Sequence, residues 1–150
     1  MVSREDNGPY NIFTETDITV EFFDLDPLSV VYHGNYIRYF EIGRRVLLEK
    51  IGYSYLEMQK SCYIFPVIEV SVKYLSSLRF LDQIRIKTIL MEYENRLKLK
   101  YEIRNVKTGI LTTKGMTTQM VFDTKSGESC FVCPAVLTEK IEALLGEKKQ

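Results

Sequence analysis

The chain has 150 residues, with 20 acidic and 20 basic side chains and an apolar fraction of 45%. This length and composition predict one globular domain that can bury a sizeable core. The zero net charge argues against a protein whose overall charge attracts nucleic acid or an anionic membrane. No apolar run approaches the ~20 residues that a membrane helix needs, and the polar N-terminus does not resemble a signal peptide.

The three cysteines are Cys62, Cys130 and Cys133. Cys130 and Cys133 have the spacing of a redox or zinc motif, but no second Cys or His pair exists to complete a zinc site. We therefore interpret all three as free, mostly buried thiols, which is typical of the reducing cytoplasm.

The first element that the sequence predicts is a strand over residues 14–24, after a loose tail over residues 1–13. Ile18, Val20 and Phe22 alternate with polar neighbours, as in a strand with one buried face. Pro27 and the polar residues around it end this strand.

A long apolar helix is predicted next, over residues 36–51. Apolar or small residues recur there at helical spacing, namely Tyr36, Phe40, Gly43, Leu47 and Ile51. A glycine inside a helix costs about 1 kcal/mol relative to alanine, so Gly43 suggests that another backbone passes close by. Gly52 is a natural end for this helix, and Ser54 with Glu57 forms a capping box for a short second helix.

Four further strands are predicted over residues 67–75, 83–91, 96–105 and 111–122. The third has the clearest alternation, because Leu97, Leu99, Tyr101 and Ile103 are interleaved with charged residues. One of its faces should be buried and the other solvated. A last helix is expected to open at Pro134 and to close at Gly146. Sequential strands with tight turns pair antiparallel, so the pattern predicts an α+β protein with helix packed on one side of an antiparallel sheet.

Asp26 and His33 are the main candidates for chemistry. His33 is the only histidine and stands seven residues after Asp26, at the start of the long helix. Backbone amides at a helix N-terminus can hold a developing negative charge, so a nearby base or nucleophile suits attack on an acyl carbonyl. The alternative is that Asp26 and Pro27 form a turn whose carboxylate caps local amides, and the residues alone favour this alternative.

Residues 26–44 resemble the signature of the 4-hydroxybenzoyl-CoA thioesterase family, and weaker matches continue to about residue 137. The nearest branch is the one that includes the Tol–Pal-associated acyl-CoA thioesterase. The residues that carry the resemblance are Asp26, Val30, Val31, Tyr32, His33, Asn35, Tyr36, Phe40, Glu41 and Arg44. It implies a hot-dog fold, an antiparallel β-sheet wrapped around a long central α-helix, in a single domain over residues 14–150.

The resemblance implies an acyl-CoA thioesterase that releases a free carboxylic acid and coenzyme A, with no metal or organic cofactor. Asp26 stands at the position of the family's base or nucleophile, and this match shifts our preference from turn to catalysis. His33 either supports the reaction or holds the loop in place. The fold builds its site between subunits, so the resemblance also implies a homodimer or homotetramer. Hydrolysis of acyl-acyl carrier protein and non-catalytic acyl-CoA binding are the alternative functions.

Further candidates for substrate binding come from several parts of the chain. Tyr32 would form a wall of the acyl pocket, and Asn35 would be a helix N-cap first and a substrate contact second. The stretch around Phe65 would offer an oxyanion amide. The candidates for coenzyme A phosphates are Arg79, Arg96 and Lys73.

Three observations limit these predictions. Residues 79–114 hold nine Lys or Arg and four Asp or Glu, an excess of five positive charges, but a solvated sheet face explains most of them. Leu28 and Ser29 stand where many family members carry glycine or alanine, and they would either narrow the site or reshape the loop. Asp24 could raise the pKa of Asp26 if the two carboxylates were close, but we interpret it as an exposed edge charge.

Overall fold

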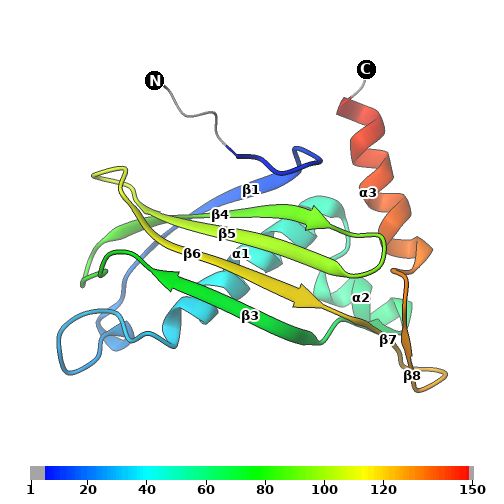
Figure 1. The fold of residues 1–150 in the computed structure, drawn as a ribbon, viewed down its shortest axis with the longest axis horizontal. Helices are drawn as coiled ribbons and strands as arrows, with labels where there is room; N and C mark the ends of the chain where they lie inside the picture. The colour runs from blue at the N-terminus through cyan, green and yellow to red at the C-terminus, as the bar shows by residue number, and fades with distance from the viewer. Residues whose placement is uncertain (1–5, 149–150) are drawn as a thin grey trace.

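A computed structural model describes residues 6–148 of the chain. It contains strands and helices in a mixed order, beginning with a strand and ending with a helix (Figure 1). Their bounds are β1 Phe13–Thr19, the 3-10 helix η1 Phe22–Asp24, α1 Asn35–Ile51, α2 Tyr55–Ser61, β2 Tyr63–Ile64, β3 Val67–Tyr74, β4 Gln83–Glu92, β5 Leu97–Asn105, β6 Leu111–Gln119, β7 Val121–Asp123, β8 Glu128–Cys130 and α3 Ala135–Lys148.

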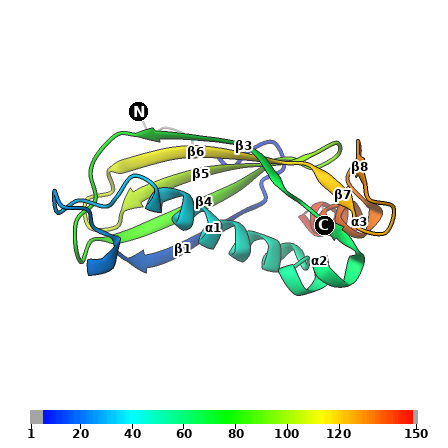
Figure 2. The ribbon, with the colours of Figure 1, turned by 90° about the horizontal axis from the view of Figure 1, so that it is seen from below.

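The main sheet has five strands in the order β1-β4-β5-β6-β3, and every neighbouring pair is antiparallel. Helix α1 lies along one face of this sheet, and α2 continues from its end (Figure 2). A smaller sheet in the order β2-β7-β8 extends from the main one. The predicted α+β architecture, with an antiparallel sheet around a long helix, is therefore confirmed.

Two glycines let α1 approach the sheet closely. A Cβ atom at Gly43 would lie 2.9 Å from Cγ2 of Ile86 and would also collide with Thr88, both on β4. A Cβ atom at Gly115 on β6 would overlap the ring of Phe40. The expectation that another backbone passes close to Gly43 is thus confirmed, and it explains why a helix former is absent there.

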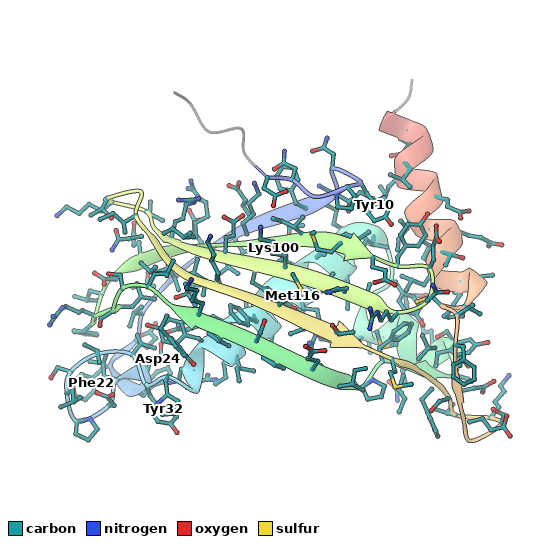
Figure 3. All side chains as sticks on the ribbon, in the orientation of Figure 1. Tyr10, Phe22, Asp24, Tyr32, Lys100 and Met116 are labelled. Carbon is teal, nitrogen blue, oxygen red and sulfur yellow. The ribbon has the colours of Figure 1, made fainter. Side chains whose placement is uncertain are left out.

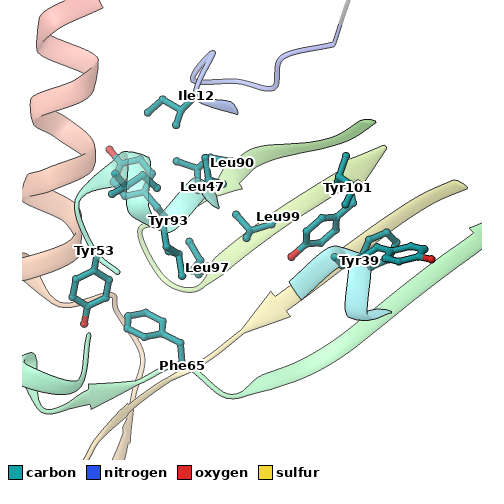
Figure 4. Close-up of a cluster of buried hydrophobic side chains, with 14 of the residues drawn as sticks. Ile12, Tyr39, Leu47, Tyr53, Phe65, Leu90, Tyr93, Leu97, Leu99 and Tyr101 are labelled. Carbon is teal, nitrogen blue, oxygen red and sulfur yellow. The ribbon is translucent and has the colours of Figure 1, made fainter. Parts of the chain in front are cut away.

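The core lies between α1 and the inner face of the sheet (Figure 4). The ring of Phe40 stacks on that of Tyr101, with centroids 4.4 Å apart. All four apolar residues of β5 are fully buried, which confirms the alternation predicted for this strand. Its charged face is less solvated than predicted at Glu102, which is 8% exposed and lies 3.4 Å from Arg104.

The prediction for the N-terminal segment is partly wrong. Ile12 is fully buried, and the ring of Tyr10 packs edge-on against Tyr93 with centroids 5.1 Å apart. Residues 10–12 are therefore packed against the domain, whereas residues 1–5 of the predicted tail lie outside the described residues. The first strand ends at Thr19, short of the predicted residue 24, and residues 22–24 form the 3-10 helix η1 instead.

Other boundaries also differ from the prediction. Ser54 caps α2 as expected, with its Oγ accepting from Glu57 N at 3.3 Å. Gly146 lies inside α3 and does not close it. The strand predicted over residues 111–122 is broken at Met120, whose N–H donates to Pro66 O, so that β7 belongs to the smaller sheet. Within residues 6–148, no helix has both the length and the hydrophobicity needed to cross a bilayer.

Candidate active site

Asp26 is the second residue of a tight hairpin formed by residues 25–31. Its N–H donates to Val30 O at 2.9 Å, and Leu25 and Val31 form an antiparallel bridge. Its carboxylate Oδ1 accepts from Leu28 N at 2.8 Å. One oxygen of Asp26 therefore caps the local turn, as the alternative interpretation predicted. We find no donor to the other oxygen, Oδ2, among residues 6–148, so it is open to a water molecule or a substrate.

Asp24 has the opposite surroundings, and our interpretation of it as an exposed charge is wrong. It is only 4% exposed, and its Oδ2 accepts from the hydroxyl of Tyr39 and from Glu21 N, each at 3.0 Å. Arg38 lies 3.6 Å from Oδ1. Burial and the nearby Asp24 carboxylate raise the pKa of Tyr39, so its hydroxyl remains a donor. Asp24 anchors the loop to α1 and is already fully engaged.

His33 lies beside a cavity of about 220 Å³ at the start of α1. The backbone O of His33 accepts from the hydroxyl of Tyr74 at 2.8 Å, and the ring of Tyr36 packs edge-on against that of Tyr74. The cavity is lined by Val31, His33, Tyr36, Tyr74, Leu75, Ser76 and Ser77. Tyr36 and Tyr74 were not among the predicted site residues, because an aromatic residue at helical or strand spacing is usually interpreted as core.

The start of α1 also presents free backbone donors. The N–H of Asn35 bonds to Tyr32 O, but within residues 6–148 we find no acceptor for the N–H of His33 or of Gly34. Gly34, and not Asn35, is the N-cap of α1, so the prediction of Asn35 as N-cap is wrong. Unpaired amides at a helix N-terminus are suited to binding an anionic oxygen.

The other predicted residues of this loop surround the same region. The ring of Tyr32 lies against that of His33, with centroids 4.3 Å apart. Asn35 Nδ2 donates to Asp24 O at 2.8 Å, so this amide ties the loop to the helix. Arg79 follows Leu78, whose carbonyl accepts from Val31 N at 2.8 Å. Figure 3 shows Asp24 and Tyr32 together in this loop region. We call this end of the main sheet the loop end.

Phe65 and Arg96 lie at the opposite end of the sheet, which we call the turn end. The strand pairing shows this. Val67, two residues after Phe65, and Leu97, next to Arg96, both pair with Gln119 at the end of β6. Tyr74, which lines the His33 cavity, instead pairs with Thr113 near the start of β6. The side chain of Phe65 is 6% exposed and packs against Tyr53. Arg96 is exposed and pairs with Glu92 at 3.3 Å. One subunit alone therefore does not bring Phe65 or Arg96 to the His33 cavity.

Among residues 6–148, neither the cysteines nor a cluster of metal ligands forms a second site. All three cysteines are free, and burial raises the pKa of the Cys133 thiol to about 12. A thiol with so high a pKa is a poor nucleophile. Within the part of the chain that the structure describes, no three His, Cys, Asp or Glu side chains are grouped so that they could hold a metal ion.

Comparisons with known proteins agree with this geometry. The chain is similar to a DHNA-CoA thioesterase from Staphylococcus aureus, with 30% identity, 92% of this chain and 96% of that chain covered, and a TM-score of 0.76. It is 26% identical over 114 residues to YneP of Bacillus subtilis (strain 168), provisionally named as an acyl-CoA thioesterase, covering 75% of this chain and 82% of that protein. A shorter match, 33% identical over 75 residues, is to the chloroplastic acyl-acyl carrier protein thioesterase ATL3 of Arabidopsis thaliana, covering 50% of this chain and 40% of that protein.

The family description that matches this chain is the thioesterase-like superfamily, and it matches residues 20–141. This range includes the hairpin with Asp26, all of α1 and every strand of the main sheet except β1. The expected relationship to the hot-dog thioesterases is therefore confirmed. The chain belongs to the thioesterase-like superfamily.

Proposed function

We propose that this protein hydrolyses acyl-CoA thioesters to a carboxylic acid and coenzyme A. The observation that carries the proposal is the free N–H of His33 at the start of α1, beside an open cavity. A thioester carbonyl oxygen that accepts from this N–H and from that of Gly34 would have its developing charge stabilised. The hairpin that holds Asp26 leads directly into this helix.

In this mechanism the free Oδ2 of Asp26 accepts a proton from water, and the water oxygen bonds to the thioester carbon. The carbonyl oxygen becomes an oxyanion held by the helix amides. When the oxyanion collapses, the carbon–sulfur bond breaks and the sulfur takes the proton, so that the acid and free coenzyme A leave. Direct attack by the Asp26 carboxylate, followed by hydrolysis of an anhydride, uses the same residue. The role of His33 in either route is to present its backbone N–H and to line the cavity with its ring.

We also propose that the working unit is a homodimer or a larger assembly of dimers. The His33 cavity of about 220 Å³ is smaller than the ~300–1,000 Å³ typical of ligand pockets. The candidates Phe65 and Arg96 lie at the turn end, and β3 has eight residues, which span about 26 Å. A second copy that pairs antiparallel along β3 would place its turn end beside this loop end. Its Arg96 could then meet the phosphates of coenzyme A together with Arg79 of the first copy.

The three free cysteines support a reducing compartment, so we propose the cytoplasm as the place of action. Hydrolysis of acyl-acyl carrier protein is the second candidate. It is favoured by the positive side chains on the outer face of the sheet, such as Lys98 and Lys114, which have no acidic partner within 4 Å among residues 6–148. An acidic carrier protein would suit that face.

The test is a hydrolysis screen that measures free thiol from aromatic and aliphatic acyl-CoA and from acyl-acyl carrier protein. Asp26→Asn should lower turnover on the best substrate at least ~100-fold, the low end for loss of a general base. Asp123→Asn is the matched control, because Asp123 Oδ1 caps Lys125 N at 2.8 Å as Asp26 Oδ1 caps Leu28 N. Near-normal turnover in folded Asp26→Asn protein, or an equal loss in Asp123→Asn, would refute the proposed role of Asp26.

A further inference from the structure

The outer face of the main sheet, away from α1, contains a cavity of about 230 Å³. Val72 packs against the core, and a Cβ atom at Gly115 would overlap the ring of Phe40, so these residues mark the inner face. The side chains that alternate with them along the strands therefore point outward. The outward-pointing residues of the lining are Ser71, Lys73, Lys100, Lys114 and Met116. Among residues 6–148, no acidic side chain lines this cavity.

Strand pairing brings the three lysines of the cavity together. Lys114 on β6 lies directly opposite Lys73 on β3, and neighbouring strands are about 4.8 Å apart. Lys100 on β5 lies opposite Met116, two residues along β6 from Lys114, and Figure 3 shows Lys100 and Met116 on neighbouring strands. Like charges directly opposite each other destabilise a sheet. An anion bound between the lysines would relieve this repulsion.

Two of these lysines have charges that are free to bind a ligand. We find no carboxylate within 4 Å of Lys73 or Lys114 among residues 6–148, and both side chains are exposed. Glu102 lies opposite Lys114 on the next strand, but it is 8% exposed and pairs with Arg104 at 3.4 Å. The positive charge at this end of the cavity is therefore not neutralised within the described chain.

The third lysine already binds a carboxylate. Asp6, which lies 94 residues from Lys100 along the chain, accepts from Lys100 Nζ at 2.7 Å. The hydrogen bond from Lys100, together with one from the N–H of Gly8, holds the pKa of the Asp6 carboxyl below its usual value. The side chain of Asp6 is 53% exposed, so another anion can take its place. This contact shows that the cavity is suited to an anion.

The size and the donors of the cavity indicate which anion it suits. Its volume is below the ~300–1,000 Å³ typical of ligand pockets, so the ligand must be compact. Glu69 on β3 and Glu102 on β5 interrupt the positive charge of the outer face, which disfavours an extended polyanion such as nucleic acid. An ammonium group has three donors, and a phosphoryl group accepts through three oxygens. Three lysines thus suit two linked phosphoryl groups better than one carboxylate.

We propose that this cavity binds a small diphosphate, either free pyrophosphate or the diphosphate of a nucleotide, which displaces Asp6 from Lys100. Lys73 and Lys114 hold one phosphoryl group, and Lys100 holds the other. The inference goes beyond the proposed function, because the cavity lies on the face of the sheet opposite α1 and the His33 cavity. Lys73, which the sequence suggested for coenzyme A phosphates, is thereby assigned to a separate site.

Calorimetric titration with pyrophosphate, at constant ionic strength and without acyl-CoA, tests the site. Lys114→Ala and Lys73→Ala should each weaken binding at least about tenfold, because each removes a charged donor to the anion. Lys107→Ala is the control for net charge. Lys107 lies in the exposed turn after β5, outside the cavity, so this change should weaken binding less than about twofold. Orthophosphate should bind wild type at least about tenfold more weakly than pyrophosphate, because it reaches fewer of the lysines.

Asp6→Asn tests the displacement. Without the carboxylate, Lys100 has no competing ion pair, so pyrophosphate should bind about two- to fivefold more tightly, as expected for the loss of an exposed pair. Asp17→Asn is the matched control, because Asp17 pairs with Arg85 at 2.8 Å on β1 and β4, outside the cavity. It makes the same change in net charge and should leave the affinity nearly unchanged. Equal effects of the two variants would refute the displacement of Asp6.

Titration with ADP distinguishes the two sources of diphosphate. Binding of both ADP and pyrophosphate, each weakened by Lys114→Ala, would support recognition of the diphosphate in either source. Binding of pyrophosphate alone, weakened in the same way, would support a site for the free anion. Binding of neither, equal affinity for orthophosphate, or an equal loss in Lys107→Ala would overturn the proposal. Because acyl-CoA is absent from these measurements, none of the outcomes depends on thioesterase activity.

Discussion

The two ends of the main sheet carry different kinds of residue. At the loop end, Asp26, Tyr32 and His33 are partly or largely exposed, and backbone hydrogen bonds such as Val31 N to Leu78 O hold their loop. At the turn end, Phe65 packs against Tyr53, and Leu97 is fully buried. The loop end therefore has polar groups free for chemistry, whereas the turn end is built mainly to be packed.

This difference explains why one subunit looks incomplete as an enzyme. The loop end supplies a helix N-terminus, a carboxylate and the small His33 cavity, and the turn end supplies apolar walls and an exposed cation. The two ends are separated by the length of β3, and the antiparallel pair of subunits that we propose would bring them together. The following predictions test how separate the two ends are, from the largest expected effect to the smallest.

Shortening a buried side chain at the turn end should lower the free energy of unfolding the most. Phe65→Ala removes a buried ring and should lower the free energy of unfolding by about 3–5 kcal/mol, measured by urea denaturation. Ile64→Ala, at the preceding residue, whose side chain is 46% exposed, should change it by less than about 1 kcal/mol. Equal effects of the two changes would mean that the turn end is not packed as described.

High pH should lower the free energy of unfolding through Tyr101, which lies in the middle of the sheet between the two ends. Burial raises the pKa of Tyr101 from 10.0 to about 12. Because the folded pKa is the higher one, the stabilisation is complete below pH 10 and is lost as the pH rises to about 12. It amounts to at most about 3 kcal/mol. Tyr101→Phe, which also loses the bond to Thr117, should flatten this part of the stability profile. An unchanged slope would exclude Tyr101 as its source.

The two aspartates of the loop end should behave in opposite ways. Asp24→Ala leaves the Tyr39 hydroxyl and Glu21 N without their acceptor and should lower the free energy of unfolding by about 1–3 kcal/mol. Asp26→Ala should lower it by less than about 1 kcal/mol, although it should also abolish most of the turnover. Thermal denaturation measured beside the hydrolysis assay checks both. A larger loss of stability in Asp26→Ala than in Asp24→Ala would reverse the roles assigned here.

The smallest effect is expected at the exposed cation of the turn end. Arg96→Ala should raise KM by about two- to fivefold and leave kcat nearly unchanged, because it removes an exposed contact made equally in ground and transition states. Added salt should reduce the effect, since exposed charges are screened over ~10 Å at 0.1 M. A truncated thioester without the nucleotide should not distinguish Arg96→Ala from wild type. Equal impairment on both substrates would make Arg96 a structural residue.

The loop around Asp26 shows how far the sequence could be interpreted and where it stopped. The motif placed a carboxylate and a histidine before a helix, and the helix begins there. The spacing did not distinguish Asp24 from Asp26, because both follow the strand at similar distance. Their difference comes from Tyr39, which lies fifteen residues from Asp24 along the chain and reaches only one of the two carboxylates.

By itself, the sequence determined the order and type of the main elements, the long helix with Gly43 against a strand, and the residues of the buried face of β5. These follow from local periodicity and capping, which act between residues close in the chain. Only the tertiary structure decided that Phe65 and Arg96 lie at the end opposite His33, that Asp24 is buried, and that β3 is one of the two edge strands of the main sheet. These depend on contacts between residues far apart in sequence, and no periodicity encodes which strand remains unpaired.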